Sequence, residues 1–325
     1  MSERKHMMNI QLDCGVDALE DILDILETES PNPNTANIDE LPIEEILRKI
    51  NEEDKKVPLA IEKAIPGIAK VVEKTVEAVE NGGKVIYMGA GTSGRVAFVD
   101  AVETVPTFSA PEGLFFPLIA GGREALSRSL ENVEDLEEEG ARDLEEIAKV
   151  SSKDVVIGIT ASGRTPYVKG GLVKAKEVGA TAVLIANVSK PALEKYADIT
   201  VKIVTGPEVI TGSTRMKAGT SQKMVLNMIS TATMIKVGKV YKNYMVDLQV
   251  LNLKLKKRAT RMISEVTGVS REEAEKYLEK ADLKPKLAIL MILSGKSKEE
   301  CEGTLKKTEK IREALKILQT EGDDK

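Results

Sequence analysis

The sequence predicts an α/β fold with a doubly wound, five-stranded parallel sheet, preceded by helices and followed by a helical bundle. Five short, evenly apolar segments carry this prediction: residues 84–89, 113–120, 154–160, 181–187 and 199–204. Strands covered by helices on both faces have this continuous apolar character, whereas amphipathic helices are longer and periodic. Helical segments separate the five runs, and this alternation is typical of a doubly wound sheet with strand order 2-1-3-4-5. Hydrophobic residues make up 42% of the chain, which suffices for a large core.

Apolar residues at helical spacing predict the helices around these strands. Before the first strand they mark residues 17–29, 42–51 and 57–80. Between the strands they mark residues 95–103, 124–149 with a break near Gly140, and 166–178, and after the fifth strand residues 221–237. From about residue 248 the chain is charged and helical. We therefore expect an N-terminal helical arm over 1–56, a sheet domain over 57–247 and a small helical domain over 248–325.

The composition excludes several kinds of chemistry. His6 is the only histidine and lies near the N-terminus, so a Ser-His-Asp triad or a histidine-rich metal site is not expected. The two cysteines, Cys14 and Cys301, are too far apart for a CxxC metal site. The remaining candidates for chemistry are carboxylates, hydroxyls, Lys, Arg and backbone amides.

Charge and hydropathy predict the cellular location of the protein and the kinds of partner that it has. The formal net charge is −5, which argues against a nucleic-acid partner. The N-terminus has no apolar signal-peptide core, and the longest apolar runs are far shorter than the roughly 20 residues of a membrane-spanning helix. We expect a cytoplasmic protein without a membrane partner.

Two similar loops follow the first and third predicted strands. Residues 89–95 read GAGTSGR and residues 160–166 read TASGRTP, so both strands deliver Ser-Gly-Arg to the start of a helix. The first loop formally matches GxGxxG, but the second strand runs into Gly121-Gly122-Arg123 instead of ending in the acidic residue that holds a ribose. A dinucleotide site is therefore not favoured.

Strands one and three are neighbours in the predicted order and flank the switch point where ligands bind. The two serine loops would then face one crevice. Hydroxyls, free backbone N–H groups and the positive ends of two helix dipoles together suit a phosphate monoester dianion. The alternative is that these residues only cap the helices that follow.

Carboxylates occur close to these loops in the sequence. Glu103 closes the predicted helix after the first serine loop, where an acidic side chain opposes the helix dipole, and Asp100 competes with it as a candidate. Glu131 and Glu134 are three residues apart on one face of the helix predicted over 124–149. The alternative for the Glu131–Glu134 pair is a solvated acidic surface.

A polar loop follows the fifth predicted strand. Two hydroxyls, Ser213 and Thr214, and two cations, Arg215 and Lys217, precede the apolar helix predicted over 221–237. Cations and hydroxyls beside a helix start suit an anionic group of a substrate. An ordinary capped loop would have the same composition, and this alternative stays open.

Several longer segments resemble the N-acetylmuramic acid 6-phosphate etherases, lyases of the sugar isomerase (SIS) domain superfamily. They include NPNTANID (32–39), GAGTSGR (89–95), GITASGRTPYV (158–168), TGSTRMKAGTSQK (211–223) and TGVSREEAE (267–275). The resemblance extends over most of the chain. It implies a SIS sheet of flavodoxin-like order and a small UBA-like C-terminal domain. The glucokinase regulatory protein resembles the same family and binds phosphosugars without catalysis.

The resemblance implies a carbon–oxygen lyase that recycles cell-wall sugars. Such an enzyme cleaves the D-lactyl ether of N-acetylmuramic acid 6-phosphate, by elimination and then hydration, to N-acetylglucosamine 6-phosphate and D-lactate. The reaction needs a base for the C2 proton and an acid for the departing lactate oxygen. It implies no metal and no redox cofactor, a phosphorylated amino sugar as ligand, and a homodimer whose active site borrows residues across the interface.

The resemblance also implies roles for single residues. Glu103 matches the acid that assists lactate departure, and Glu134 matches the second catalytic glutamate, for which we expect C2 proton abstraction. The expected phosphate and sugar contacts are Thr92, Ser93, Gly94, Ser162, Gly163 and Thr165. Secondary candidates, for the lactyl carboxylate or the subunit interface, are Arg164, Ser213, Arg215 and Lys217.

One segment departs from the family pattern. The family usually has Asp-Ala-Ser-Glu-Cys-Pro-Pro-Thr where residues 100–107 read Asp-Ala-Val-Glu-Thr-Val-Pro-Thr, so the glutamate is kept and its neighbours differ. The alternatives are a lyase for a related 6-phosphosugar, a phosphosugar isomerase and a non-catalytic phosphosugar-binding regulator. The C-terminal bundle would serve the enzyme as a lid over the crevice or the regulator as a partner-binding surface.

Overall fold

The computed structural model describes residues 27–323 of the chain. His6, Cys14 and most of the helix predicted over 17–29 lie outside the described residues. The described end of that predicted helix, residues 27–29, is a turn.

All five predicted strands are present and form one parallel sheet. They are β1 (Val85–Gly89), β2 (Phe115–Ile119), β3 (Val155–Thr160), β4 (Thr181–Ala186) and β5 (Ile199–Lys202). Their order is β2-β1-β3-β4-β5, which confirms the predicted doubly wound topology. β1 and β3 are neighbours, with Gly89 opposite Ile159, so the chain segments that leave both strands emerge side by side.

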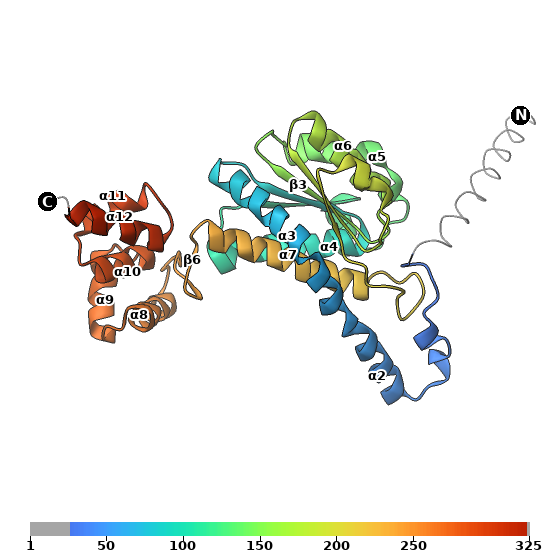
Figure 1. The fold of residues 1–325 in the computed structure, drawn as a ribbon, viewed down its shortest axis with the longest axis horizontal. Helices are drawn as coiled ribbons and strands as arrows, with labels where there is room; N and C mark the ends of the chain where they lie inside the picture. Colours follow the sequence, from blue (N-terminus) through green and yellow to red (C-terminus); the bar gives the residue numbers. More distant parts are fainter. Residues whose placement is uncertain (1–26, 324–325) are drawn as a thin grey trace, which may run out of the picture.

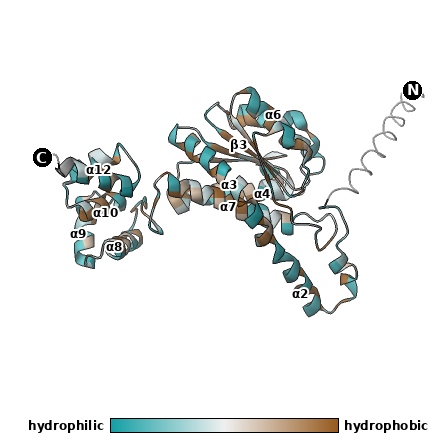
Figure 2. Ribbon diagram, viewed as in Figure 1, coloured by the Kyte–Doolittle hydropathy of each residue, from teal (hydrophilic) through white to brown (hydrophobic). Residues whose placement is uncertain are grey.

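Helices cover both faces of this sheet, as Figure 1 shows. Val85 and Tyr87 of β1 pack with α3 (Lys56–Glu80), α4 (Gly91–Phe108) and α7 (Lys217–Lys236). Ile86 and Met88 point to the other face and pack with α6 (Pro166–Glu177). Alternate residues of each strand are therefore buried on opposite sides, which is why the strands are apolar throughout. Hydrophobic colouring accordingly gathers in the strands in Figure 2.

The helix predicted over 95–103 is wrong at both ends. α4 begins at Gly91, so the Gly-Thr-Ser-Gly run is its first turn, although two glycines disfavour a helix there. Close packing overrides this preference, because a Cβ on Gly94 would lie 2.5 Å from the side chain of Ile119. The helix also continues past Glu103 and through Pro106 to the buried Phe108.

The prediction of a helix over 124–149 with one break near Gly140 is also wrong. The chain instead forms η3 (Gly122–Leu126), a loop, η4 (Val133–Asp135), α5 (Glu137–Arg142) and η5 (Asp143–Ile147). Asn132 has a φ of 63°, which ends any regular helix between the loop and η4. α5 packs closely on α6, since a Cβ on Gly140 would lie 1.9 Å from the carbonyl oxygen of Tyr167.

The N-terminal arm consists of η1 (Pro33–Thr35), η2 (Ile38–Glu40) and α2 (Ile43–Asp54). Figure 1 shows α2 projecting from the sheet domain. Ile43 and Leu47 of α2 are 78% and 60% exposed, so this amphipathic helix has an apolar face without a partner among the described residues. Such a face is typical of a surface that a second protein chain covers.

The C-terminal region has a core of its own. It contains a hairpin of β6 (Val240–Tyr241) and β7 (Tyr244–Met245) and a bundle of five helices: α8 (Leu253–Thr267), α9 (Arg271–Lys280), α10 (Pro285–Ser294), α11 (Lys298–Leu305) and α12 (Ile311–Asp323). The apolar run of α10 is the centre of this bundle, where Leu287, Ile289 and Leu290 are buried. Among the described residues, no helix has both the length and the apolar character to cross a membrane.

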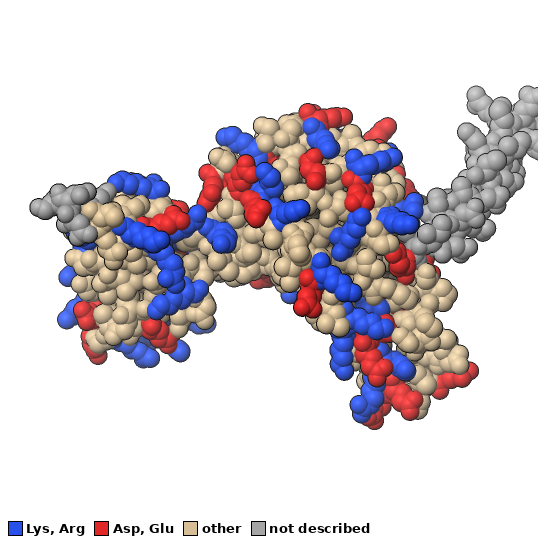
Figure 3. Space-filling view, in the orientation of Figure 1, with Lys and Arg blue, Asp and Glu red and all other residues tan. Residues whose placement is uncertain are grey.

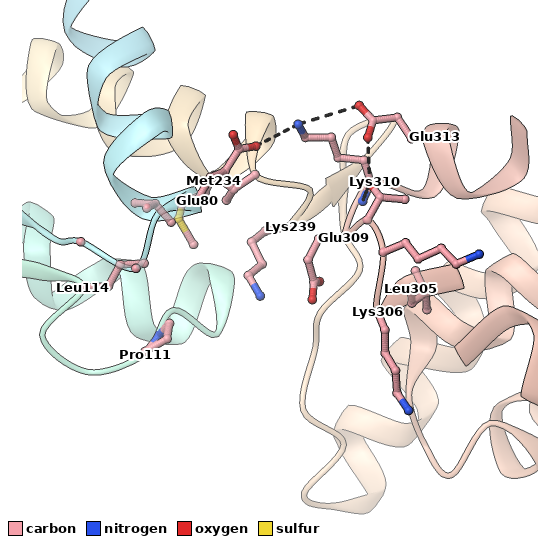
Figure 4. Close-up of a pocket in the computed structure, with 16 residues that line it drawn as sticks. Glu80, Pro111, Leu114, Met234, Lys239, Leu305, Lys306, Glu309, Lys310 and Glu313 are labelled. Carbon is pink, nitrogen blue, oxygen red and sulfur yellow. Dashed lines mark hydrogen bonds and ion pairs between the residues drawn. The ribbon is translucent and has the colours of Figure 1, made fainter. Parts of the chain in front are cut away.

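The bundle adjoins the sheet domain at the joint drawn in Figure 4. The Lys310 ammonium group forms a 3.0 Å ion pair with Glu80 at the end of α3. A pocket of about 870 Å³ lies between the sheet domain and the bundle. Gly83 and Leu114, which directly precede the β1 and β2 regions, line this pocket. The bundle therefore lies at the amino edge of the sheet, so within one chain it is not a lid over the serine loops at the carboxyl edge.

Charges of both signs are mixed over the molecule. Figure 3 shows Lys and Arg beside Asp and Glu on the sheet domain and on the bundle. Many of these charges form ion pairs, such as Lys256 with Glu275 and Lys176 with Asp198. The face in view consequently has no extended patch of one sign.

Candidate functional site

The segments after β1 and β3 enclose a pocket of about 330 Å³ at the carboxyl edge of the sheet. It is lined by five of the residues predicted for the site: Thr92, Ser93, Glu134, Ser162 and Thr165. The pocket lies at the switch point between β1 and β3, as the strand order predicts. The structure thus brings both serine segments and one predicted catalytic carboxylate together.

Two glycines shape the walls of this pocket. Gly94 is buried, with Gly89 O and the Ile119 side chain where a Cβ would be. Gly163 has a φ of 70° and lies against Pro191, leaving no space for a side chain. Neither glycine is among the lining residues, so both act on the pocket through the packing of their segments.

The serine hydroxyls do not cap the helices that follow them. The N-cap of α4 is Ala90 and that of α6 is Thr165, and neither makes a side-chain capping bond. The Thr165 hydroxyl instead lies 2.7 Å from the hydroxyl of Thr160. Among the described residues, no hydrogen bond engages the hydroxyls of Ser93 and Ser162. These groups, and the first N–H groups of α4 and α6, are therefore available to an anion.

The start of α7 is different because a carboxylate already occupies it. The buried Glu208 accepts hydrogen bonds from the backbone N–H groups of Lys217 and Ala218, both over 2.9 Å. Burial raises the pKa of Glu208, and the two N–H donors oppose that rise. Of the three helices that start at this edge, α4 and α6 thus have free N-termini and α7 does not.

Lys217 was predicted to hold a substrate anion, and the structure places it elsewhere. Its side chain is almost fully buried, and its ammonium group donates to Glu53 Oε2 over 2.7 Å. Burial alone would raise the pKa of Glu53, but hydrogen bonds from Lys217, Lys56 and Asn34 lower it to about 2. The Lys217 charge is therefore balanced within the chain.

The other secondary candidates lie beside the pocket and do not line it. Ser213 is half-buried and Arg215 is exposed, whereas Thr214 between them is a lining residue. Arg164 is half-buried, and its Nε atom is buried without a hydrogen-bond partner among the described residues. A buried guanidinium N–H in this state is suited to donate a hydrogen bond to an anionic ligand.

The acidic residues of the pocket come from irregular segments. Glu134 is half-buried in η4, whereas Glu131 is exposed in the loop before it, so the prediction of one shared helical face is wrong. Arg95 of α4 holds this loop, because its guanidinium donates to the carbonyl oxygens of Ala125 over 3.0 Å and Arg128 over 2.8 Å. Arg95 thus fixes the wall that carries Glu134.

Glu103 lies outside the pocket of its own chain. It is exposed on α4, five residues before the helix ends at Phe108, so the prediction that it closes the helix is wrong. Asp100, its rival, is buried and accepts hydrogen bonds from Tyr87, Asn227 and Ser230. Burial raises the pKa of Asp100 against these donors. Asp100 therefore joins β1, α4 and α7, and only Glu103 is accessible.

Comparison with curated proteins shows the family. The chain is 60% identical over 297 residues to an N-acetylmuramic acid 6-phosphate etherase of Petrotoga mobilis, which covers 91% of this chain and 99% of that protein. It is 56% identical over 292 residues to the protein of the same name from Pseudothermotoga lettingae, with 90% and 97% covered. This chain belongs to the N-acetylmuramic acid 6-phosphate etherase family. The resemblance predicted from its motifs is confirmed.

Domain families also match parts of this etherase-family chain. They are the glucokinase regulatory protein N-terminal SIS domain over residues 67–176, the SIS domain over 125–232 and the C-terminal lid domain of glucokinase regulatory protein over 242–286. A solved phosphoheptose isomerase from Francisella tularensis has a TM-score of 0.45 and 18% identity, covering 58% of this chain and 98% of that one. The predicted SIS fold is confirmed by the domain match and the strand order.

Sequence reasoning missed two polar groups in the pocket of this etherase-family chain. They are Glu29 and Ser129, which both line it, whereas Thr214 lines it from the loop whose two hydroxyls were expected to hold an anion. Glu29 lies three positions before the NPNTANID segment (32–39), which was the available signal, but the helix predicted over 17–29 included it. In the described residues, no group of three or more His, Cys, Asp or Glu side chains is arranged to hold a metal ion.

Proposed function

We propose that the chain is an N-acetylmuramic acid 6-phosphate etherase. It cleaves the D-lactyl ether at C3 of the sugar and produces N-acetylglucosamine 6-phosphate and D-lactate. The observation that carries the proposal is the identity of 60% with a curated etherase over 91% of the chain. The pocket supports it independently, because two free helix N-termini and the half-buried Glu134 meet there.

The phosphate binds at the N-termini of α4 and α6. Backbone N–H groups and the hydroxyls of Thr92, Ser93 and Ser162 face this position, and both helix dipoles favour negative charge. Thr165 also lines the pocket, while Gly94 lets the first segment pack against Ile119 and Gly163 lets the second pack against Pro191. Arg164, Ser213 and Arg215 are candidates for the lactyl carboxylate or the subunit interface. Lys217 supports the fold through Glu53.

The two glutamates carry the proton transfers. Glu134 takes the C2 proton, the electron pair of the C2–H bond forms the C2–C3 double bond, and the C3–O bond to the lactyl group breaks. Glu103 gives a proton to the departing lactate oxygen. In the second step Glu103 takes a proton from water as the oxygen adds to C3, and C2 is protonated again. One water molecule is consumed and both glutamates return to their starting protonation states, and because there is no net oxidation or reduction the sequence needs no redox partner.

Glu103 reaches a pocket only from a second copy of the chain. On α4 it is surrounded by exposed apolar side chains, since Val99, Val102 and Val105 are 55%, 50% and 37% exposed. An apolar groove of about 730 Å³ runs beside them, lined by Phe98, Val102 and Phe116. A carboxylate within an unpartnered apolar stripe is expected at an interface that buries it beside a ligand. We therefore propose a homodimer in which Glu103 completes the site of the partner.

The domain division and the location follow from the same proposal. The arm over 1–56, the sheet domain over 57–247 and the small domain over 248–325 would be the three working parts. A cytoplasmic location suits an enzyme of phosphorylated sugars and the buried free thiol of Cys301.

Release of D-lactate from N-acetylmuramic acid 6-phosphate tests the activity. The wild-type protein should release D-lactate, and Glu103→Gln should abolish release while it keeps affinity for the sugar phosphate. Intact substrate after incubation with folded wild-type protein would reject the etherase. If that inactive protein still binds the phosphosugar tightly, the correct function is that of a non-catalytic regulator. The matches to domains of the glucokinase regulatory protein favour this alternative.

A further inference from the structure

Glu29 brings a carboxylate to the pocket that the proposed proton transfers do not use. It is half-buried and lines the pocket together with Ser93 and Glu134. Its Oε2 atom lies beside Gly212, because a Cβ added to that glycine would be 2.8 Å from this oxygen. Among the described residues, no cation pairs with this carboxylate.

Residues 27–35, the N-terminal strap, hold Glu29 in this position. Glu27 accepts a hydrogen bond from Ser189 N over 3.2 Å. Asn32 donates to Pro207 O over 3.3 Å, and the Thr35 hydroxyl donates to Val209 O over 2.8 Å. Figure 1 shows the strap beside the loop that leads to α7. A carboxylate on a segment fixed at both ends is preorganised for a ligand.

The electrostatics of the pocket orient a sugar phosphate. The phosphate favours the N-termini of α4 and α6, where the helix dipoles are positive, and the Glu29 and Glu134 carboxylates that line the same pocket repel it. The neutral sugar ring is therefore the part of the ligand that these carboxylates can contact. A carboxylate accepts hydrogen bonds from the hydroxyl groups of a sugar.

The proposed elimination creates a need for one more proton transfer. The C2 proton becomes acidic when C1 is a carbonyl, whereas a hexosamine phosphate in water is mostly a cyclic hemiacetal. The ring must therefore open before Glu134 acts. Opening removes a proton from the C1 hydroxyl and delivers one to the ring oxygen.

We propose that Glu29 opens the sugar ring, an inference that rests on the proposed etherase function. Its carboxylate takes the proton of the C1 hydroxyl, and the electron pair left on that oxygen forms the C1 carbonyl. The bond between C1 and the ring oxygen breaks, and the ring oxygen takes a proton from water. Glu29 then returns its proton to solvent, so the step is balanced without any other reactant.

Glu131 is the rival carboxylate, and the structure favours Glu29 over it. Glu131 also lines the pocket, but it is exposed and belongs to the loop after η3. A solvated side chain is poorly positioned and competes with water for the hydroxyl group. Glu29 is half-buried on an anchored strap, so its position is defined before the sugar binds.

Exchange between the anomers of N-acetylglucosamine 6-phosphate tests the proposal, because anomers interconvert only through the open chain. Exchange spectroscopy by NMR measures this rate with the C1 position labelled. Wild-type protein should accelerate exchange, and Glu29→Gln should lower the catalysed rate by about 100-fold or more. Glu29→Asp, which keeps a carboxylate, should restore part of it. Glu40→Gln removes an exposed charge from η2 and should leave exchange at the wild-type rate.

The outcomes separate this proposal from the etherase itself. Glu103→Gln should stop D-lactate release and keep anomer exchange, since ring opening precedes elimination. Three results would each overturn the role of Glu29. The first is a Glu29→Gln variant that exchanges the anomers at the wild-type rate. The second is a loss of exchange in Glu131→Gln while Glu29→Gln retains it, and the third is a wild-type protein that does not accelerate exchange. Exchange without D-lactate release by wild-type protein would reject the etherase alone. Binding of the sugar phosphate by Glu29→Gln, measured by calorimetry, shows that the variant is folded.

Discussion

Lys217 and Glu53 form a 2.7 Å ion pair between side chains that are almost completely buried, although they are 164 residues apart in the sequence. Glu53 also accepts hydrogen bonds from Asn34 and Lys56. The pair joins the end of α2 to the start of α7, which adjoins the loop that carries Thr214. It thereby connects the N-terminal arm to one wall of the pocket.

Lys217→Met should destabilise the protein by about 3–5 kcal/mol, because it leaves a buried carboxylate without its main cation. The double variant Lys217→Met/Glu53→Gln should be less destabilised, since it removes both charges. Denaturant unfolding followed by circular dichroism measures both values. Equal destabilisation of the single and double variants would show that the charges themselves are unimportant.

The same pair predicts how stability depends on pH. The pKa of Glu53 is about 2 in the folded state and its ordinary value is 4.5. The unfolded state therefore binds the proton more tightly, so the pair stabilises the fold above about pH 4.5 and this contribution falls as pH decreases toward 2. The stability difference between wild type and Glu53→Gln should shrink over this interval. A constant difference from pH 6 to pH 3 would contradict the assignment.

The free hydroxyls at the starts of α4 and α6 predict the strength of phosphate binding. Ser93→Ala/Ser162→Ala should weaken binding of N-acetylglucosamine 6-phosphate by about 10- to 100-fold, because each hydroxyl donates to a charged oxygen. Circular dichroism should be unchanged, since neither hydroxyl has a partner among the described residues. Ser127→Ala/Ser152→Ala, two exposed serines outside the pocket, is the control. Unchanged calorimetric affinity of the first variant would place the phosphate elsewhere.

Two glycines in the C-terminal region should respond oppositely to alanine. Gly238 follows Val237, the C-cap of α7, with a φ of 90°, and a Cβ there would lie 2.6 Å from Glu309 O at the joint with the bundle. Gly238→Ala should therefore lower the free energy of unfolding by more than about 1 kcal/mol. Gly303 lies in α11 with open space around it, so Gly303→Ala should raise stability by about 0.5–1 kcal/mol. Thermal unfolding measures the stability of both variants. A loss of stability in both would mean that the geometry of the joint is not the cause of the loss in Gly238→Ala.

The strands and the position of the pocket could be predicted because their causes are local. Each strand is a short apolar run, and the serine segments directly follow two of them, so topology alone brings Ser93 and Ser162 together. The relation to the etherase family could also be predicted, since several of the segments that carry it are long. Burial on both faces of the sheet leaves a clear pattern in sequence.

The rest depends on contacts between distant residues. The start of α7 was missed because Glu208, which lies before the helix, accepts from its first N–H groups. The loop over 127–132, between η3 and η4, was missed because Arg95 of α4 donates to the carbonyl oxygens of Ala125 and Arg128. Lys217 looked like an anion ligand because Glu53, its partner, is 164 residues away. Local propensity contains none of this information.

Glu103 and Glu134 should act in one site from different chains. Glu134 lines the pocket of its own chain, whereas Glu103 is exposed on α4 among Val99, Val102 and Val105. In a mixed dimer of Glu103→Gln and Glu134→Gln chains, one site would then contain both glutamates and the other site neither.

Each variant alone should release D-lactate at least about 100-fold more slowly than wild type, as expected for loss of a general acid or base. Co-expression with two different affinity tags isolates the mixed dimer, which should recover about half of the wild-type rate per dimer, because one of its two sites is intact. A double variant carrying both substitutions, paired with wild-type chains, is the matched control: each of its sites has one glutamine, so it should stay inactive. Recovery in this control and none in the first mixture would place both glutamates in one chain, and a monomer by light scattering would remove the shared site altogether.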